Sequence, residues 1–220
     1  MTVDFRVYLI TDRGLCSRGD LLGTVTRALQ GGVRAVQLRE KDLPARDLFR
    51  LAERMRERTA EYGARLFIND RADVARAVGA DGVHLGVLSI PPREARRLLG
   101  TEAVIGCSAH NAEELRQARE GGADFVTFGP VYPTPSKGPF GPPVGIPALS
   151  EACRTAGIPV FALGGIGPGN LEEVARAGSF GVALISGIIA AADPRAAAGL
   201  LTGYFARGSL RAKAEREGAS

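Results

Sequence analysis

The sequence contains no tryptophan, and aromatic residues make up only 6% of its 220 residues. Proteins that bind single-stranded nucleic acid without sequence preference stack the bases on aromatic side chains, so this composition argues against that class. The formal net charge is only +4, and it is too diffuse to form the basic stripe that duplex binding needs. We therefore expect no nucleic-acid partner.

Cysteine is also scarce, with three widely spaced residues, Cys16, Cys107 and Cys153. An odd number at these spacings predicts neither a disulfide framework nor a zinc site, and is typical of reduced thiols. No apolar run reaches membrane length, and no basic-then-apolar leader opens the chain. These absences predict a cytoplasmic protein with no membrane partner.

What the chain does have is a regular alternation of short apolar runs and helical patterns, separated by glycine-rich turns. The apolar runs lie at 6–10, 33–38, 65–68, 82–85, 103–106, 124–128, 158–163 and 181–185. The helical patterns lie at 21–30, 46–62, 72–78, 92–99, 112–120, 147–156, 170–177 and 190–204. Strict strand–helix alternation implies a parallel sheet with helices outside it. Eight units predict a single (β/α)8 TIM barrel over 1–206, with a mobile basic tail at 207–220. A doubly wound open sheet is the alternative.

The stretch at 160–187 contains two strand ends of unusual composition. The seventh strand ends in Gly164-Gly165, and the eighth ends at Ile185 before Ser186-Gly187, which opens a helix. Glycines let the backbone approach a ligand, and the amides at a helix start favour an anion. The pair resembles the phosphate site after strands 7 and 8 of a barrel. Tight turns chosen for close packing are the alternative.

Polar residues cluster at the other predicted strand ends, which point at the active site of such a barrel. Gln37, Arg39 and Lys41 alternate at the end of the second strand, so they share one face if the strand continues, and two cations on a buried face need an anion. The alternative is that Arg39 and Lys41 pair with Glu40 or Asp42 in solvent. The Gly/Pro-rich loop at 129–143 is long enough to be a lid, and it carries the phosphate-binding candidates Thr134, Ser136 and Lys137.

Strands three to five end in further candidates. Asn69 and Asp70 follow the third strand, where Asp70 is a weak magnesium ligand or a helix cap. His84 lies within the fourth strand and is expected to be structural. Ser108 and His110 follow the fifth strand. Imidazole suits proton transfer near neutral pH, so His110 is the first candidate for a general base. The alternative is that His110 has only a structural role, as the residue before the helix cap Asn111.

These motifs together resemble the thiamin phosphate synthase / TenI superfamily over about residues 5–200. They are YLITD at 8–12, QLREK at 37–41, FINDR at 67–71, GVHLG at 82–86, IGCSAH at 105–110, FGPVYPTPSKG at 128–138, ALGGI at 162–166 and ALISGI at 183–188. The resemblance implies a (β/α)8 barrel that acts on a thiazole phosphate.

The resemblance also implies residue roles. The pyrimidine diphosphate of the synthase would meet Gln37, Arg39, Lys41, Asn69, Ser108 and Lys137. The thiazole phosphate would meet the loop Thr134–Ser136, Gly165 and the Ile185-Ser186 turn. Asp70 would be a magnesium ligand. The second magnesium aspartate of the synthase is missing from this chain, which has Ser89 there.

Because of that substitution, we expect a TenI-like thiazole tautomerase of thiamin biosynthesis, an isomerase that aromatises a carboxythiazole phosphate and needs no cofactor. In it His110 moves the proton, while Gly164, Gly165, Ser186 and Gly187 hold the substrate's phosphate. A magnesium-dependent thiamin phosphate synthase, a transferase, is the first alternative. A non-catalytic regulator that binds thiamin phosphate is the second. The sequence leaves a homo-oligomer possible.

Overall fold

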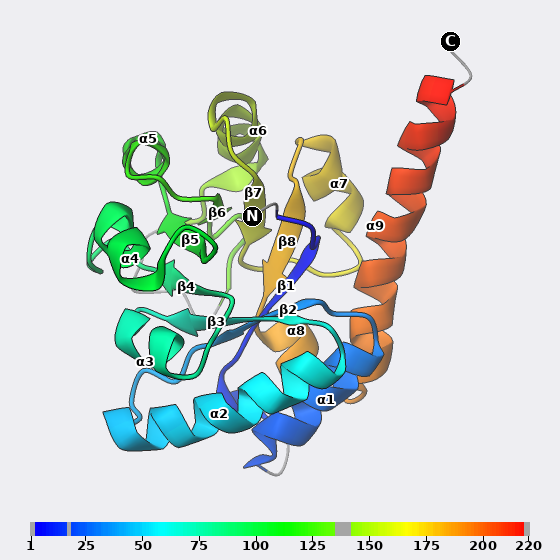
Figure 1. Ribbon diagram of the computed structural model, residues 1–220. Coiled ribbons are helices and arrows are strands. Elements are labelled where there is room, and N and C mark those ends of the chain that lie inside the picture. Colours follow the sequence, from blue (N-terminus) through cyan, green and yellow to red (C-terminus); the bar gives the residue numbers. More distant parts are fainter. Residues whose placement is uncertain (1–2, 17–18, 135–141, 218–220) are drawn as a thin grey trace.

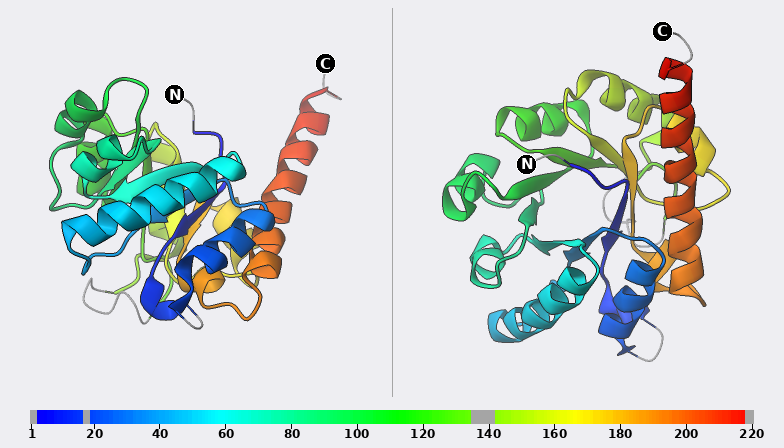
Figure 2. Two further views of the ribbon diagram at one scale, coloured as in Figure 1. Left: turned by 60° about the horizontal axis from the view of Figure 1, so that its bottom comes forward. Right: turned by 45° about the vertical axis from the view of Figure 1, so that its right-hand side comes forward.

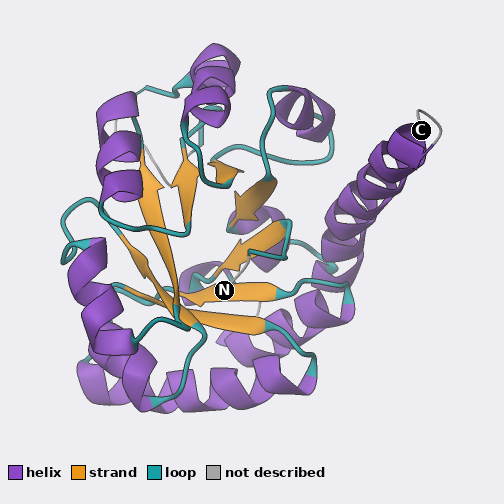
Figure 3. Ribbon diagram, turned by 45° about the horizontal axis from the view of Figure 1, so that its top comes forward, coloured by secondary structure: helices purple, strands orange, loops and turns teal. Residues whose placement is uncertain are grey.

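Eight parallel strands form a closed barrel in the computed structural model, which describes residues 3–16, 19–134 and 142–217, the last ten of these by their backbone alone. Each strand pairs with the next, and β8 pairs with β1, as Leu9 lies opposite Leu184. Figure 3 shows the strands inside and the helices around them. The strands are β1 (Val7–Ile10), β2 (Ala35–Leu38), β3 (Arg65–Asn69), β4 (Gly82–Leu85), β5 (Val104–Ala109), β6 (Phe125–Phe128), β7 (Val160–Leu163) and β8 (Gly181–Leu184).

The helices follow the strands in the expected order, and α1 and α5 begin after residues whose side chains cap them. Asp20 accepts a hydrogen bond from the Gly23 amide before α1, and Asn111 accepts one from the Glu114 amide before α5. The helices are α1 (Leu21–Gln30), α2 (Ala45–Glu61), α3 (Ala72–Ala77), α4 (Pro92–Leu99), α5 (Ala112–Glu120), α6 (Gly145–Thr155), α7 (Leu171–Arg176), α8 (Ser186–Ile189) and α9 (Pro194–Glu217), with the 3-10 turn η1 at Arg13–Leu15.

Aromatic rings fill much of the barrel interior. Phe67, Phe125 and Phe161 are fully buried, and each lies opposite a glycine on a neighbouring strand. A Cβ at Gly82 would lie 2.9 Å from the Phe67 ring, and one at Gly181 would lie 2.7 Å from the Phe161 ring. These strand glycines therefore make room for the rings, and the barrel is a packed core rather than a pore.

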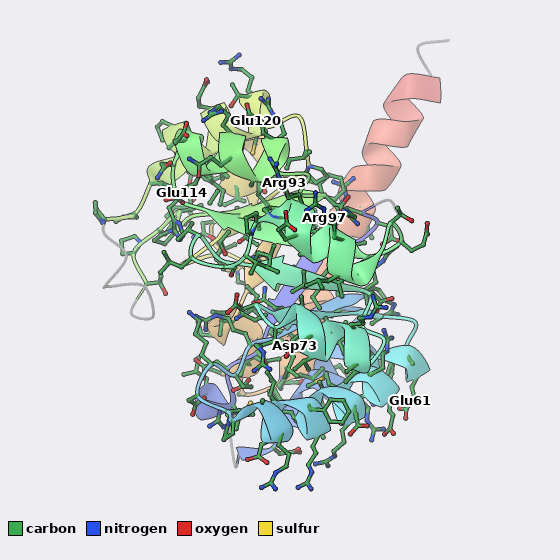
Figure 4. The ribbon with its side chains drawn as sticks, turned by 60° about the vertical axis from the view of Figure 1, so that its left-hand side comes forward. Glu61, Asp73, Arg93, Arg97, Glu114 and Glu120 are labelled. Carbon is green, nitrogen blue, oxygen red and sulfur yellow. The ribbon has the colours of Figure 1, made fainter. Side chains whose placement is uncertain are left out.

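Charged side chains cover the outer faces of the helices, as expected where one face packs on the strands and the other meets water. Figure 4 labels several of them on α2 to α5, among them Glu61, Arg97 and Glu120. Many form pairs one turn apart, such as Arg97 with Glu94 at 2.9 Å. Among the described residues, no helix is both long enough and apolar enough to cross a lipid bilayer.

The predicted fold class is confirmed, and the open-sheet alternative is wrong because β1 and β8 close the ring. The last helix differs from its predicted range. It begins at Pro194 instead of residue 190, because a separate short helix α8 uses Ser186–Ile189. It also runs on to Glu217, and its end projects from the face of the barrel opposite the carboxyl ends of the strands (Figures 1 and 2). The mobility of the tail stays a prediction.

Candidate active site

Two cavities lie at the carboxyl ends of the strands and gather most of the predicted residues. The first, about 410 Å³ in volume, lies over β2 to β5, and the second, about 390 Å³, lies over β6 to β8. The first is lined by Arg39, Lys41, Asn69, Asp70, Ser89, Ser108 and His110. The second is lined by Thr134, Gly164, Gly165, Asn170, Ile185, Ser186 and Gly187. Ser136 and Lys137 lie outside the described residues.

The two cations after β2, Arg39 and Lys41, line the first cavity. The acidic residues next to them in sequence form ion pairs with Arg13 instead. Arg13 donates to Glu40 at 3.1 Å and to Asp42 at 2.6 Å, and Glu40 also accepts a hydrogen bond from the Thr11 hydroxyl at 2.6 Å. Arg39 and Lys41 form no ion pair within the described part of the chain. The solvent pairing that was the alternative interpretation is therefore wrong, and both cations are available to an anion.

The surroundings of Lys41 disfavour its positive charge. Partial burial, together with the neighbouring Arg39, lowers the pKa of Lys41 below the ordinary lysine value, while Asp70 opposes that shift. A like charge and desolvation both disfavour the charged form of an amine. The attraction of an anion in this cavity would offset both effects, so the arrangement fits a phosphate-bearing ligand.

Asp70 occupies the first cavity with an unusual backbone. Its φ of 64° is the positive value that non-glycine residues rarely adopt, although aspartate and asparagine tolerate it best. The turn is fixed by its amide, which donates to the His84 carbonyl at 2.8 Å. The carboxylate has no hydrogen-bond partner among the described residues. An unfavourable backbone conformation at Asp70 thus accompanies a carboxylate that lies in the cavity without a hydrogen-bond partner among the described residues.

The oxygen atoms near Asp70 decide whether magnesium fits there. Ser89 lines the same cavity, and its hydroxyl accepts a hydrogen bond from the Gly86 amide at 2.8 Å. No cluster of three metal-binding side chains occurs in the described residues. Magnesium commonly binds one or two carboxylates together with substrate phosphates. The donor set thus fits an ion held largely by a substrate's phosphate oxygens, with Asp70 as its protein carboxylate.

The second cavity is lined by backbone rather than by charged side chains. The amides of Gly165, Ser186 and Gly187 form no hydrogen bond within the described residues. Asn170 fixes the turn beside them, since it accepts from the Gly167 amide and donates to the Gly165 carbonyl, both at 2.9 Å. Free amides in a fixed turn favour an anion. Sequence analysis missed Asn170 because it was assigned to the following helix.

The glycine pair also has a packing role. Gly164 and Gly165 have φ values of 97° and 66°, and a Cβ at either would approach the loop after β6, 2.6 Å from Pro130 Cβ or 2.7 Å from Tyr132 Cβ. Tyr132 in turn donates a 2.6 Å hydrogen bond to Glu173 of α7, and burial, aided by that carboxylate, raises its pKa to about 12. The packing interpretation of these glycines is therefore confirmed, since the loop they admit forms one wall of the cavity. Phosphate binding at this turn stays a prediction.

His110 and Glu114 form a pair at the start of α5. The Glu114 carboxylate lies 2.8 Å from His110 Nδ1 and accepts from the His110 amide at 2.7 Å. Glu114 is the third residue of α5, the position from which a glutamate reaches back in a capping box. His110 therefore has a structural role at the helix start, while its side chain also lines the first cavity.

Two predicted residues lie below the cavities. Gln37 is buried, and its amide nitrogen donates to the Tyr8 hydroxyl at 3.2 Å. His84 is also buried, with Nε2 3.2 Å from the Ser108 hydroxyl oxygen, which confirms its expected hydrogen-bonded role. Neither side chain lines either cavity. Tyr8 was missed because its strand position looked like ordinary core.

Comparison with known families identifies the chain. The family described as thiamine monophosphate synthase matches residues 7–188. The chain belongs to this family. Its match covers all eight strands and both cavities, so the family's barrel and the site described above are the same part of the molecule.

Individual members are close in sequence and structure. The chain is 58% identical to the "Putative thiamine-phosphate synthase" of Geobacter sulfurreducens over 193 residues, 88% of this chain and 91% of that protein. It is 44% identical to the thiamine-phosphate synthase of Roseiflexus sp. (strain RS-1), over 87% of this chain and 81% of that one. The thiamine phosphate pyrophosphorylase structure from Pyrococcus furiosus superposes with a TM-score of 0.81 at 37% identity, covering 90% and 93%.

These comparisons overturn the expected thiazole tautomerase and its assignment as an isomerase, since the relatives carry the synthase name. The structure agrees with this correction, because two separate cavities at the carboxyl ends of the strands leave room for two anionic substrates. The sequence interpretation gave too much weight to the missing carboxylate at Ser89.

Proposed function

We propose that the chain is a thiamine-phosphate synthase, which joins a pyrimidine diphosphate to a thiazole phosphate and releases pyrophosphate. The observation that carries the proposal is the pair of cavities at one barrel mouth. One has cations and a carboxylate, and the other has free amides and no charged lining side chain. Two phosphorylated substrates that must meet need two such sites side by side.

The first cavity suits the diphosphate. Negative charge develops on the diphosphate as it leaves, and groups fixed in advance around that charge lower the barrier. Arg39 and Lys41 supply two positive charges there, while Asn69 and Ser108 supply polar side chains that can donate hydrogen bonds. Magnesium, held by Asp70 and the diphosphate oxygens, would neutralise further charge on the leaving group.

The second cavity suits the phosphate of the thiazole. The amides of Gly165, Ser186 and Gly187 would donate to its oxygens, and the Asn170 side chain holds their turn in place. Binding both substrates in fixed positions converts their encounter into an intramolecular step. The chain's main contributions are thus orientation and neutralisation of charge, and His110 has no assigned proton to move.

An assay with purified protein tests the proposal. Pyrimidine diphosphate, thiazole phosphate and magnesium are mixed with the protein, and thiamine phosphate and pyrophosphate are measured. We expect the two products in equal amounts, and Arg39→Met should lower kcat/KM by about a hundredfold or more. Arg46→Met is the control, because Arg46 is a well-exposed arginine that lines neither cavity. Binding of both ligands without product would instead indicate a non-catalytic binder.

A further inference from the structure

A chain of buried polar side chains crosses the barrel interior just below the first cavity. The Gln37 amide nitrogen lies 3.2 Å from the Tyr8 hydroxyl, which lies 3.4 Å from His84 Nδ1. On the other side of the ring, His84 Nε2 lies 3.2 Å from the Ser108 oxygen and 3.4 Å from that of Thr127. Tyr8, Gln37 and His84 are each at most 2% exposed. Ser108 alone of the five lines the cavity.

The chemistry of these groups gives the chain a direction. An amide NH2 can only donate, so the Tyr8 oxygen accepts from Gln37 and its own hydrogen must point elsewhere. His84 Nδ1 is the acceptor within reach, and a neutral imidazole that accepts at Nδ1 carries its proton on Nε2. That Nε2–H then donates to Ser108. The Ser108 oxygen has thereby accepted a bond, and its hydrogen is left for the cavity.

Packing holds the His84 ring in this orientation. Gly106 lies opposite His84 on the next strand, and a Cβ there would lie 2.6 Å from His84 Nδ1. The Tyr8 and Phe125 rings flank the imidazole with centroids 5.6 and 5.8 Å away. A ring confined in this way cannot readily flip its two nitrogens, so the direction of the hydrogen bonds is built into the fold.

We propose that Tyr8 and His84 are positioning residues that make Ser108 an obligate hydrogen-bond donor to the anionic substrate in the first cavity. The inference rests on the proposed function, because it takes that substrate to be the diphosphate. With the direction reversed, the Ser108 hydroxyl would donate to His84 and turn only lone pairs toward the anion. The buried chain therefore decides whether this hydroxyl attracts or repels the substrate.

A double-mutant cycle tests whether Tyr8 acts through Ser108. Ser108→Ala and Tyr8→Phe should each lower kcat/KM for the pyrimidine diphosphate by about tenfold, the worth of a hydrogen bond to a charged group. The double variant should be no worse than Ser108→Ala. Tyr62→Phe is the matched control, since its hydroxyl also accepts from a glutamine, Gln30, at 3.3 Å but lies away from the cavities. Losses that simply add would overturn the proposal.

A second measurement does not depend on activity. The chain has only two histidines, so protein labelled with nitrogen-15 histidine gives two sets of ring signals, and His110→Asn assigns them. We expect neutral His84 with its proton on Nε2 in the free protein, and a mixture of tautomers in Tyr8→Phe. A proton on Nδ1, or a charged ring at neutral pH, would overturn the proposal even in an active synthase. If the synthase assay fails but His84 carries its proton on Nε2, the proposed function is contradicted, while the predicted hydrogen-bond direction is supported.

The variant His84→Gln separates positioning from folding. Its side-chain amide can donate to Ser108 and accept elsewhere, whereas His84→Leu can do neither. We expect His84→Gln to recover part of the activity that His84→Leu loses, at similar thermal stability. Equal loss in both variants would show that the residue serves packing alone.

Discussion

Ser89 occupies a place in the first cavity where the resemblance to the synthases leads us to expect an aspartate. Its hydroxyl is neutral and already accepts a hydrogen bond from the Gly86 amide. Glu40 also lines the cavity, but Thr11 and Arg13 donate hydrogen bonds to its carboxylate. Among the described residues that line the cavity, Asp70 is therefore the carboxylate left for magnesium. The substitution is thus a local loss of negative charge beside two cations. It removes one potential magnesium ligand from the site without changing the fold.

We predict that Ser89→Asp lowers the magnesium concentration needed for half-maximal synthase activity, because a second carboxylate strengthens an oxygen site. Titration of magnesium in the synthase assay measures this. Ser89→Asn is the matched control of similar size without charge. Asp70→Asn, which keeps the backbone at positive φ, should raise the magnesium requirement about tenfold or more. An unchanged titration in both Ser89→Asp and Asp70→Asn would contradict magnesium binding here.

The protonation of Lys41 should set the upper end of the pH range in which the first cavity binds anions. Its pKa is already lowered by partial burial and by Arg39, so it loses its proton at a lower pH than an ordinary lysine. We expect the affinity for pyrophosphate to fall as the pH rises through that lowered pKa, since the neutral amine no longer attracts the anion. Inhibition by pyrophosphate across the alkaline range measures this. Lys41→Arg, which stays charged, should move the fall to higher pH, and an unmoved profile would contradict the assignment.

At the scale of elements, the turn between β7 and α7 is built around Asn170. Its side chain bridges the two ends of the glycine-rich turn, from the Gly167 amide to the Gly165 carbonyl. We predict that Asn170→Ala raises KM for the thiazole phosphate several-fold, because the loosened turn must be ordered on binding. KM for the pyrimidine diphosphate is the internal control and should change little. Equal changes in both constants would point to a general loss of structure.

A repeated aspartate motif holds the amino ends of neighbouring strands. Asp124 accepts from Arg96 of α4 at 2.7 Å and from the Ile105 amide of β5 at 2.6 Å. Asp81 does the same for Arg56 and the Leu66 amide of β3. Each carboxylate ties a helix to the strand that follows it. An arginine of the helix and an amide of the strand, both partly buried, thus share one acceptor.

We predict that Asp124→Ala lowers the free energy of unfolding by about 1–3 kcal/mol, because it leaves two partly buried donors unpaired. Urea denaturation followed by circular dichroism measures this. Glu113→Ala is the control, since Glu113 pairs with Arg116 on the exposed face of α5, where a surface pair contributes little. A destabilisation no larger than that of the control would contradict the structural role of Asp124.

At the scale of the whole molecule, α9 has two parts. Its first turns pack on α1, with Ala198 and Leu201 buried and the Thr202 hydroxyl donating to the Gly31 carbonyl at 2.9 Å. The later turns project from the barrel face opposite the two cavities (Figure 1). We predict that a chain ending at Arg207 keeps its melting temperature within about 2 °C and its synthase activity. Melting followed by circular dichroism and the synthase assay measure this, and a large loss of either would show that the tail supports the barrel.

Much of the architecture could be predicted from the chain alone. Eight apolar runs are each followed by a helical pattern, and a glycine lies just past the first seven of these patterns. This order allows little other than a parallel sheet wrapped in helices. Strand ends then locate the polar residues of a barrel at one rim, which is why Arg39, Asp70, Ser108 and Gly165 were found. The helix start at Ser186 was visible in the same way.

Other features depended on contacts between residues distant in sequence. Arg13 removes Glu40 and Asp42 from the cations after β2, and no local pattern announces a partner 27 residues away. Tyr8, Gln37 and His84 meet only because three strands curve around one interior. Asn170 faces back onto its own turn instead of capping α7. Pairing of this kind is a property of the closed barrel.

The sequence by itself determined the barrel, its rim and the glycine-rich turns after the last two strands, since these follow from periodicity and from where strands end. Only the tertiary structure decided that the rim divides into two cavities, one basic and one lined by amides. The reason is physical: charge is read locally along a chain, but its availability to a ligand depends on which neighbours neutralise it after folding.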